Sequence, residues 1–283
     1  MQRIRIMTDS TSDLTASFIE EHQIAVIPLY VNFNDRVFRD GVDLNAEQLY
    51  QTVAETDVFP KTSSPSPSDF LERFTPAIEA GDDILFIGIS SRLSSTIQNA
   101  RIAASEFDDH RIEVIDSLNL SAGIGVLVMK AIMLLKEEPL SLSQLAERIR
   151  TLVPKVRTYF AVDTLEYLHR GGRCSAMENL VGSMLRIRPI LEVVEGQIIV
   201  NRKVRGKREK LMNEMVELFL QDHPHIDPLS VVVNQSMCPE DAQQLSDQLT
   251  SIMPDAQITL TQAGCVICSH CGPKTFSIVY FRQ

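Results

Sequence analysis

Basic residues are scarce relative to acidic ones in this sequence of 283 residues. Lysine and arginine together number 27, against 37 aspartate and glutamate residues, and the formal net charge is −10. A protein of this charge is repelled by phosphate polymers and by anionic lipid surfaces. We therefore expect no nucleic acid among its partners.

A long uninterrupted apolar run and an even set of cysteines are also missing. The longest apolar stretch, residues 118–135, is broken by Asn119, Ser121 and Lys130, so it predicts a buried helix rather than a membrane span. The five cysteines are an odd number in a chain long enough to fold without cross-links, which favours a reducing compartment. The N-terminus shows no leader pattern. We expect a cytoplasmic protein without a membrane span.

Several catalytic signatures do not occur. There is no phosphate-binding loop of the form G-x-x-x-x-G-K-[ST], and residues 123–128 lack the third glycine of a dinucleotide fingerprint. The H-E-x-x-H and G-x-S-x-G patterns of metalloproteases and α/β-hydrolases are absent as well. These absences disfavour a self-contained kinase or dehydrogenase, and we expect no bound cofactor.

Strand-like and helix-like segments alternate along the chain. Apolar, β-rich runs cover residues 3–8, 84–89 and 112–115, and each is followed by polar capping residues and a helical pattern. This alternation predicts a largely parallel sheet that helices cover on both faces.

The second half of the chain begins a new unit. A helical pattern over residues 142–152 is closed by Pro154, and strand and helix patterns then resume, including a hairpin around Glu195-Gly196. We therefore expect an α/β fold with two α/β domains, over residues 1–155 and 156–283.

Two segments are rich in hydroxyl groups. Residues 62–67 read Thr-Ser-Ser-Pro-Ser-Pro, and the prolines stiffen a backbone whose hydroxyls can serve an anion; a linker or helix start is the alternative. Residues 90–96 follow a predicted buried strand and precede a helix, so their hydroxyl and N–H groups are suited to a carboxylate or phosphate. Ordinary N-capping is the alternative for this second segment.

Two further segments are rich in positive charge. Residues 163–173 place Arg170 and Arg173 beside two glycines, a composition suited to binding phosphate or an acidic surface; a helix end with a glycine stop is the alternative. A basic run covers residues 202–208, and solvated strand and helix faces also explain it.

A cysteine cluster lies near the C-terminus. Cys265, Cys268 and Cys271 fall at C-x₂-C-x₂-C spacing with His270 among them, which supplies enough ligands for a zinc site. A second pair at zinc-ribbon distance and the further cysteine of an iron–sulfur run are absent. We favour packed thiols and expect no metal. The alternative is a metal-dependent or thiol-dependent enzyme built on His270 and these cysteines.

The order of these motifs resembles that of the DegV family. The resemblance rests on residues 9–13, 62–67, 91–96, 165–173 and 270–273, and it spans nearly the whole chain. It implies a bacterial protein of two α/β domains, with a site at and between the domains that holds a long-chain fatty acid. It also implies that the protein is not an enzyme itself. Where an ATP-dependent fatty acid kinase exists, the fatty acid would be presented to it and phosphorylated to acyl-phosphate for phospholipid synthesis.

The resemblance assigns roles to nine residues of this sequence. A carboxylate is already a nucleophile at neutral pH, so its partners need only position it and screen charge. The residues expected to bind the carboxylate are Thr62, Ser94 and His270. Further candidates for the pocket mouth are Ser63, Ser95 and Thr96. The residues expected to serve phosphoryl transfer or kinase docking are Arg170, Arg173 and Arg202.

Overall fold

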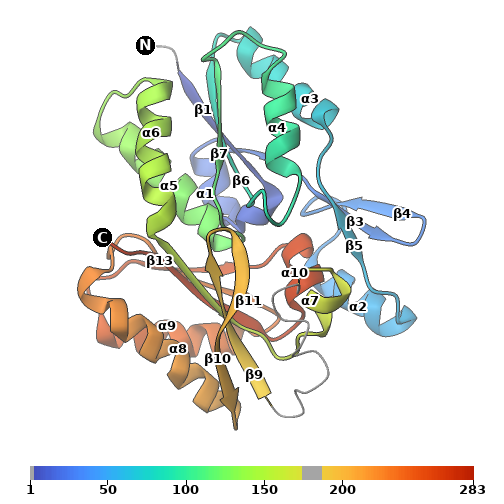
Figure 1. Ribbon diagram of the computed structural model, residues 1–283, viewed down its shortest axis with the longest axis vertical. Helices are drawn as coiled ribbons and strands as arrows, with labels where there is room; N and C mark the ends of the chain where they lie inside the picture. Colours follow the sequence, from blue (N-terminus) through green and yellow to red (C-terminus); the bar gives the residue numbers. More distant parts are fainter. Residues whose placement is uncertain (1–2, 174–186) are drawn as a thin grey trace.

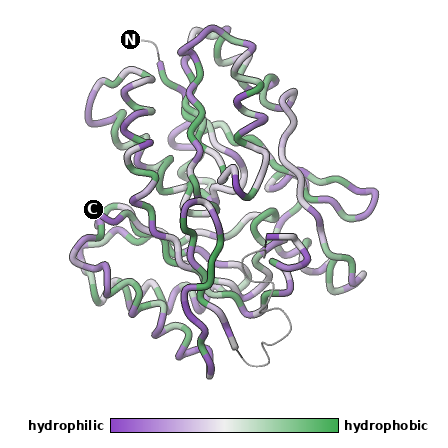
Figure 2. Tube along the Cα trace, viewed as in Figure 1, coloured by the Kyte–Doolittle hydropathy of each residue, from purple (hydrophilic) through white to green (hydrophobic). Residues whose placement is uncertain are grey.

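The computed structural model describes residues 3–173 and 187–283, which form a mixed α/β fold with three sheets. Figure 1 shows the four-stranded sheet and its helices above the six-stranded sheet, with the three-stranded sheet projecting to the right. Figure 2 shows apolar segments running along the strands of the two larger sheets, whereas polar segments predominate on the outer turns. The predicted fold class is confirmed.

The four-stranded sheet is entirely parallel, as the alternating pattern predicts. Its strands, in spatial order, are β2 (Ala25–Ile27), β1 (Ile4–Asp9), β6 (Asp83–Gly88) and β7 (Ile112–Asp116). Alternation along β6 turns Phe86 toward α3 (Pro67–Glu79) and α4 (Thr96–Ala104), and Leu85 toward the opposite face. Helices therefore cover both faces of this sheet.

The opposite face of the four-stranded sheet packs against the strongly apolar helix α5 (Ala122–Glu137) and against α6 (Leu142–Leu152). The same face also contacts the short α1 (Ala16–Glu21) and the residues on either side of it. Because α5 also contacts Val232 and Val279 of the six-stranded sheet, it is buried between two layers. This confirms the buried helix predicted from the apolar run. No helix of the described ranges is long and apolar enough to cross a membrane.

The six-stranded sheet differs from the first because it is mainly antiparallel. Its order is β10 (Gln197–Arg205), β9 (Ile187–Val194), β8 (Val156–Ala161), β13 (Thr275–Phe281), β11 (Val231–Ser236) and β12 (Ile258–Gln262). Only β11 and β12 pair in parallel. The predicted hairpin joins β9 to β10, and both turn residues, Glu195 and Gly196, have positive φ.

One face of the six-stranded sheet is covered and the other remains partly open. The helices α8 (Arg208–Asp222) and α9 (Pro239–Ile252) pack on the first face through an apolar cluster. The second face packs against α5, and parts of it also contact the short helices near residues 168 and 268. All strands of this sheet begin at or after Val156, although the domain boundary at residue 155 stays a prediction.

The three-stranded sheet is formed early in the chain and packs against a helix near the C-terminus. Its strands are β4 (Arg36–Arg39), β3 (Tyr30–Phe33) and β5 (Lys61–Ser63), all antiparallel. It packs against α2 (Ala46–Thr56) and α10 (Cys265–Cys271), and α7 (Glu166–Arg170) places Tyr167 beside Tyr50 of α2. Thr62 on β5 therefore lies close to α10.

Candidate functional site

Two adjoining cavities lie where α10 meets the sheets. The inner cavity lies against the face of the six-stranded sheet that is opposite α8 and α9. The outer cavity lies beside β5 and the β6–α4 loop. Both are lined by Leu120, Ile198, Ile267 and His270. The shared residues place the two cavities side by side, one toward the three-stranded sheet and the other toward the six-stranded sheet.

The wall of the inner cavity is mostly apolar, although many of the residues that line it have polar side chains. Its floor is formed by alternate residues of three central strands, namely Thr158, Phe160, Asn234, Ser236, Thr275 and Ser277. The Thr158 hydroxyl donates to Asn119 Oδ1 at 2.8 Å, and the Thr275 hydroxyl donates to the Cys271 carbonyl at 2.9 Å. Because these oxygens are bonded to the protein, the wall is mostly apolar and fits an alkyl chain.

The outer cavity gathers the predicted carboxylate ligands. Thr62, Ser63, Ser94, Arg173 and His270 all line it. Thr62 Oγ1 lies 2.8 Å from His270 Nε2, although the two residues are separated by 208 positions. The structure therefore brings one cation, one imidazole and three hydroxyls together at the polar end of an otherwise apolar space.

His270 is neutral and fixes the direction of this hydrogen bond. Burial, together with the nearby charge of Arg173, lowers the pKa of His270 to about 3. Its Nδ1 atom is buried without a hydrogen-bond partner in the described part of the chain. An unpartnered N–H would cost more than an unpartnered lone pair, so the proton lies on Nε2 and is donated to Thr62 Oγ1. The Thr62 hydroxyl is then free to donate to an anion.

Ser94 lies in the cavity wall, one residue before Ser95, the N-cap of α4. The hydroxyl of Ser94 accepts from the Thr96 N–H at 3.3 Å and lies 2.8 Å from Thr96 Oγ1, whereas the N-cap residue Ser95 makes no side-chain cap hydrogen bond. Thr96 is fully buried and supports Ser94, and Ser95 bonds Ser64 across the two hydroxyl-rich loops at 2.6 Å. Ser94 and Ser63 line the cavity, whereas Ser95 and Thr96 hold the loops behind it.

The structure places the three predicted arginines in different surroundings. Arg173 lines the outer cavity, where it donates to the Leu93 carbonyl at 3.0 Å and where burial lowers its pKa. Arg170 forms an ion pair with Glu166 and stacks 4.0 Å above the ring of Phe59. Arg202 lies on the α8 side of the sheet, where its guanidinium pairs with two glutamates, Glu214 at 2.7 Å and Glu217 at 3.1 Å. Of the three, Arg173 alone is a lining residue of the two cavities.

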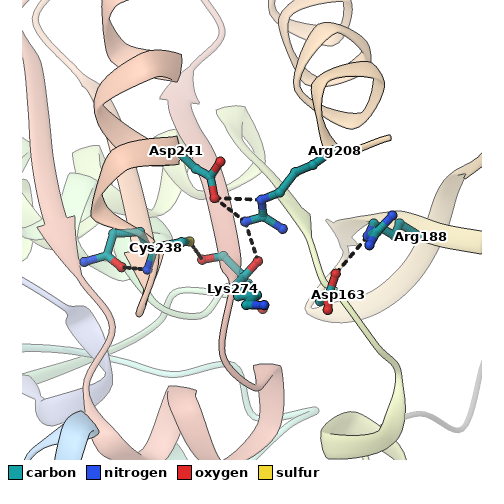
Figure 3. Close-up of polar contacts among 8 residues, drawn as sticks. Asp163, Arg188, Arg208, Cys238, Asp241 and Lys274 are labelled. Atoms are coloured by element: carbon teal, nitrogen blue, oxygen red, sulfur yellow. Dashed lines mark hydrogen bonds and ion pairs between the residues drawn. The ribbon is translucent and has the colours of Figure 1, made fainter. Parts of the chain in front are cut away.

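The basic run at residues 202–208 is partly paired and partly exposed. Figure 3 shows Arg208 bonded to Asp241 at the start of α9 and to the Lys274 carbonyl before β13, and these bonds measure 2.6 and 2.9 Å. In the same view Arg188 of β9, outside the run, pairs with Asp163, which follows β8. The remaining members of the run, Lys203, Arg205 and Lys207, are exposed, as expected of solvated strand and helix faces.

The cysteines of α10 are packed as buried thiols. Cys265 Sγ donates to the Leu44 carbonyl at 3.1 Å, while Cys268 and Cys271 donate to other carbonyls at 3.4 Å. Burial raises the pKa of Cys265, and the side-chain interaction with Cys268 together with burial raises the pKa of Cys271, so both are protonated thiols. Within residues 3–173 and 187–283, no group of three acidic, histidine or cysteine side chains is arranged to hold a metal. The geometry favours packed thiols over an enzyme built on this cluster.

The glycines of the segment 163–173 end a helix and also approach the site. Gly171 is the C-cap of α7, and a Cβ atom there would lie 2.1 Å from His270 Nδ1. The predicted alternative of a helix with a glycine stop is therefore correct locally.

Sequence reasoning missed α10 itself, because its V-I-C core reads equally well as a short strand. It also missed Leu120, Ile198 and Ile267, which join the two cavities.

Comparisons with known proteins agree with this geometry. The family described as "Uncharacterised protein, DegV family" matches residues 3–283. A DegV domain-containing protein of Deinococcus radiodurans is 34% identical over 279 residues, with 97% of each chain covered. A DegV family protein from Thermus thermophilus, solved to show fatty acid binding, is 31% identical with a TM-score of 0.92 over 100% of both chains. DegV of Bacillus subtilis, a fatty acid binding protein, is 27% identical with a TM-score of 0.88 over 100% of both chains.

Proposed function

The chain belongs to the DegV family, and we propose that it is a non-catalytic carrier of one long-chain fatty acid. The observation that carries this proposal is the pair of adjoining cavities, of which the outer one has polar residues and the inner one a mostly apolar wall. The carboxylate would be bound by Thr62 and Ser94, with His270 orienting the Thr62 hydroxyl, and the alkyl chain would extend past Ile267 into the inner cavity. The structures from Thermus thermophilus and Bacillus subtilis, which are of fatty acid binding proteins, support the same ligand class.

The two ends of the ligand contribute differently to affinity. Each buried CH₂ group contributes about 0.8 kcal/mol, so the alkyl chain supplies most of the binding free energy. A hydrogen bond to the charged carboxylate contributes roughly 1.5–3 kcal/mol and fixes which end of the ligand faces outward. The hydroxyl groups at the carboxylate end therefore mainly fix the orientation of the ligand. The loss of affinity on removing one of them is still large enough to measure.

We expect Thr62→Ala and Ser94→Ala each to weaken fatty acid binding about tenfold, because each removes one donor to a carboxylate withdrawn from water. Displacement of a fluorescent acyl probe measures the affinity. Thr250→Ala, an exposed threonine on α9, is the matched control and should bind as the unaltered protein does. Unchanged affinity in the double variant Thr62→Ala/Ser94→Ala would rule out the proposed carboxylate site.

We further propose that the bound carboxylate is presented to an ATP-dependent fatty acid kinase and converted to acyl-phosphate for phospholipid synthesis. The sequence has no phosphate-binding loop of its own, and Arg173 is a half-buried cation that lines the outer cavity. Such a cation screens the negative charge that develops during phosphoryl transfer. Arg170 on α7 and Arg202 on the α8 side of the six-stranded sheet are proposed docking residues. The described cysteines are free thiols, which supports the cytoplasm as the compartment.

We expect the purified protein to show no ATP turnover and to yield acyl-phosphate only when the kinase is added. Arg173→Ala should lower the kinase-coupled rate by more than it weakens acyl binding, because the alkyl chain still anchors the ligand. Arg202→Ala, assayed in parallel, tests docking at a position remote from the cavities. Acyl affinity and acyl-phosphate formation are measured on the same preparations. Equal losses in both assays would assign the arginines to the lipid site or to the fold instead.

A further inference from the structure

The loop that follows β1, residues 9–13, is a buried polar hub of the molecule. It includes the short 3₁₀ helix η1 (Ser10–Ser12). Three glycines from distant segments leave room for it: a Cβ atom at Gly88 would lie 2.9 Å from Asp9 Oδ2, at Gly125 2.7 Å from the Ser12 carbonyl, and at Gly264 3.4 Å from Asp13 Oδ1. The proposed carboxylate site and alkyl cavity make no use of this loop directly.

Asp13 joins three walls of the inner cavity. Its Oδ2 atom accepts from the Ser121 hydroxyl at 2.5 Å and from Asn234 Nδ2 at 3.1 Å, and its Oδ1 atom accepts from the Gly264 N–H at 2.8 Å. Ser121 and Asn234 line the inner cavity. Gly264 is the N-cap of α10, the helix that carries Ile267 and His270. One carboxylate thus holds the start of α5, the strand β11 and the helix α10.

The polar hub also includes the carboxylates of Asp9, in the same loop, and Asp40, which follows β4, and through them it reaches the outer cavity. Asp40 accepts from the Cys265 N–H at 2.7 Å and from the Ser10 hydroxyl at 2.9 Å. Asp9 accepts from the N–H of Ile89, a residue of the outer cavity wall, at 2.8 Å. The walls of both cavities are therefore tied to one group of three buried carboxylates.

These carboxylates have no cation to balance them. None of the ion pairs within the described residues includes Asp9, Asp13 or Asp40. Burial raises the pKa of Asp13 to about 7 and that of Asp9 to about 6, against the opposing effect of their hydrogen bonds, and burial also raises the pKa of Asp40. The negative charge of Asp40 adds to the rise at both neighbours.

The titratable groups around Asp13 come from three elements. Asp9 ends β1, Asp40 follows β4, and Cys265 on α10 faces Asp40 as a protonated thiol. The other two walls, α5 and β11, present the neutral Ser121 and Asn234. Every ionisation in this group therefore adds negative charge to the same buried volume, and water that enters between the walls relieves it.

We propose that Asp13 is a positioning residue for the acyl site, acting through Ser121, Asn234 and α10, and that its proton controls how tightly the cavity walls close on the alkyl chain. The inference rests on the proposed function. In the protonated hub no charge is buried, and the Ser121 hydroxyl can turn to accept the proton of Asp13, so the walls stay together. The ionised hub favours an arrangement in which the carboxylates are hydrated, and this loosens the hold of the walls on the ligand.

The sign of the pH dependence follows from proton linkage. The closed form binds more protons than an open form whose carboxylates have ordinary pKa values near 4. The closed form is therefore fully favoured at low pH and loses that advantage as the pH rises through the raised pKa values of Asp9 and Asp13, about 6 and about 7. Acyl affinity should fall between about pH 6 and pH 8.

The test uses hexadecane-1-sulfonate as the acyl probe, because its head group stays ionised over this pH range and so does not titrate itself. We expect the affinity of the unaltered protein to fall about tenfold between about pH 6 and pH 8, because pH 6 lies about one unit below the raised pKa of Asp13, about 7, and each such unit corresponds to a factor of ten. Asp13→Asn should flatten this profile. Asp255→Asn, which removes the same charge from an exposed position, should keep it. A flat profile in the unaltered protein, or an equal slope in Asp13→Asn, would overturn the proposal.

Two further variants keep the test decisive if Asp13→Asn folds poorly. The exchange Asp13→Asn/Asn234→Asp retains one carboxylate and one amide at the same junction, so the pH dependence should return. Ser121→Ala removes a hydrogen bond that favours the ionised carboxylate, so the fall in affinity should shift to higher pH. No shift in Ser121→Ala would contradict the proposal. Failure of the unaltered protein to bind any long-chain anion at low pH would instead reject the carrier function itself.

Discussion

The Ser277→Leu variant is expected to lose about a hundredfold in affinity for a sixteen-carbon fatty acid and to keep its affinity for a ten-carbon one. Ser277 lies on β13 and lines the inner cavity. Thr275, two residues earlier on the same strand, bonds the Cys271 carbonyl at the end of α10. Ser277 therefore lies about 6.6 Å farther along β13 than the residue that contacts the end of α10.

The size of this effect follows from the methylene groups that the leucine displaces. A leucine side chain fills space that three or four CH₂ groups of a long ligand would occupy, and each contributes about 0.8 kcal/mol when buried. The resulting loss of about 3 kcal/mol corresponds to roughly two powers of ten in Kd. A shorter chain ends before it reaches this position, so its binding should be unaffected.

Calorimetric titration of both fatty acids against the same preparation measures this length dependence. Ser251→Leu makes the same chemical change at an exposed position of α9 and is the matched control. Thermal unfolding of each variant shows whether the added side chain disturbs the core. An equal loss for both chain lengths would indicate damage to the carboxylate end or to the fold, and would contradict the assignment of the inner cavity to the alkyl chain.

Elements with strong local signals could be predicted closely from the sequence. The helix α6 begins after Ser141, whose side chain and that of Gln144 form a reciprocal capping box. The hairpin between β9 and β10 follows from two residues that adopt positive φ at the turn. Such features depend on neighbours within a few positions, which is why composition and periodicity are sufficient to find them.

The composition of the cavity could not be predicted in the same way, because it depends on pairings between distant strands. Thr158, Asn234 and Ser277 are polar residues that read as solvent-facing positions in the sequence. The strand order places them on one face, and their partners turn the polar atoms of Thr158 and Asn234 away from the cavity. The apolar character of this wall is therefore a tertiary property.

The position of Arg202 shows how one local irregularity changes the face of the sheet on which a residue lies. Ile198 of β10 lines both cavities, and strict alternation would turn residue 202 toward the same face. The register of β10 against β9 shifts between Val200 and Arg202, so Arg202 faces α8 and pairs with Glu214 there. A bulge of this kind leaves no clear signal in the sequence of a single strand.

The second large effect is expected at Gly171, whose importance comes from close packing rather than from backbone conformation. Gly171 has an ordinary φ of −77°, so alanine suits its backbone, but the added Cβ would lie 2.1 Å from His270 Nδ1. The imidazole must move, and with it the donor that orients the Thr62 hydroxyl. We expect Gly171→Ala to weaken fatty acid binding at least about tenfold, the effect of losing one hydrogen bond to a charged group.

The neighbouring glycine is the matched control. Gly172 has a φ of +70° and open space around its Cβ position, so Gly172→Ala costs about 1 kcal/mol of stability through the left-handed backbone and touches no ligand-binding group. Thermal unfolding and acyl-probe displacement should therefore separate the pair: Gly172→Ala lowers the melting temperature with little change in affinity, whereas Gly171→Ala lowers affinity by more than its stability loss explains. Fatty acid affinity preserved in Gly171→Ala would show that the His270–Thr62 hydrogen bond does not orient the carboxylate, and the polar end of the site would then depend on Ser94 and Arg173.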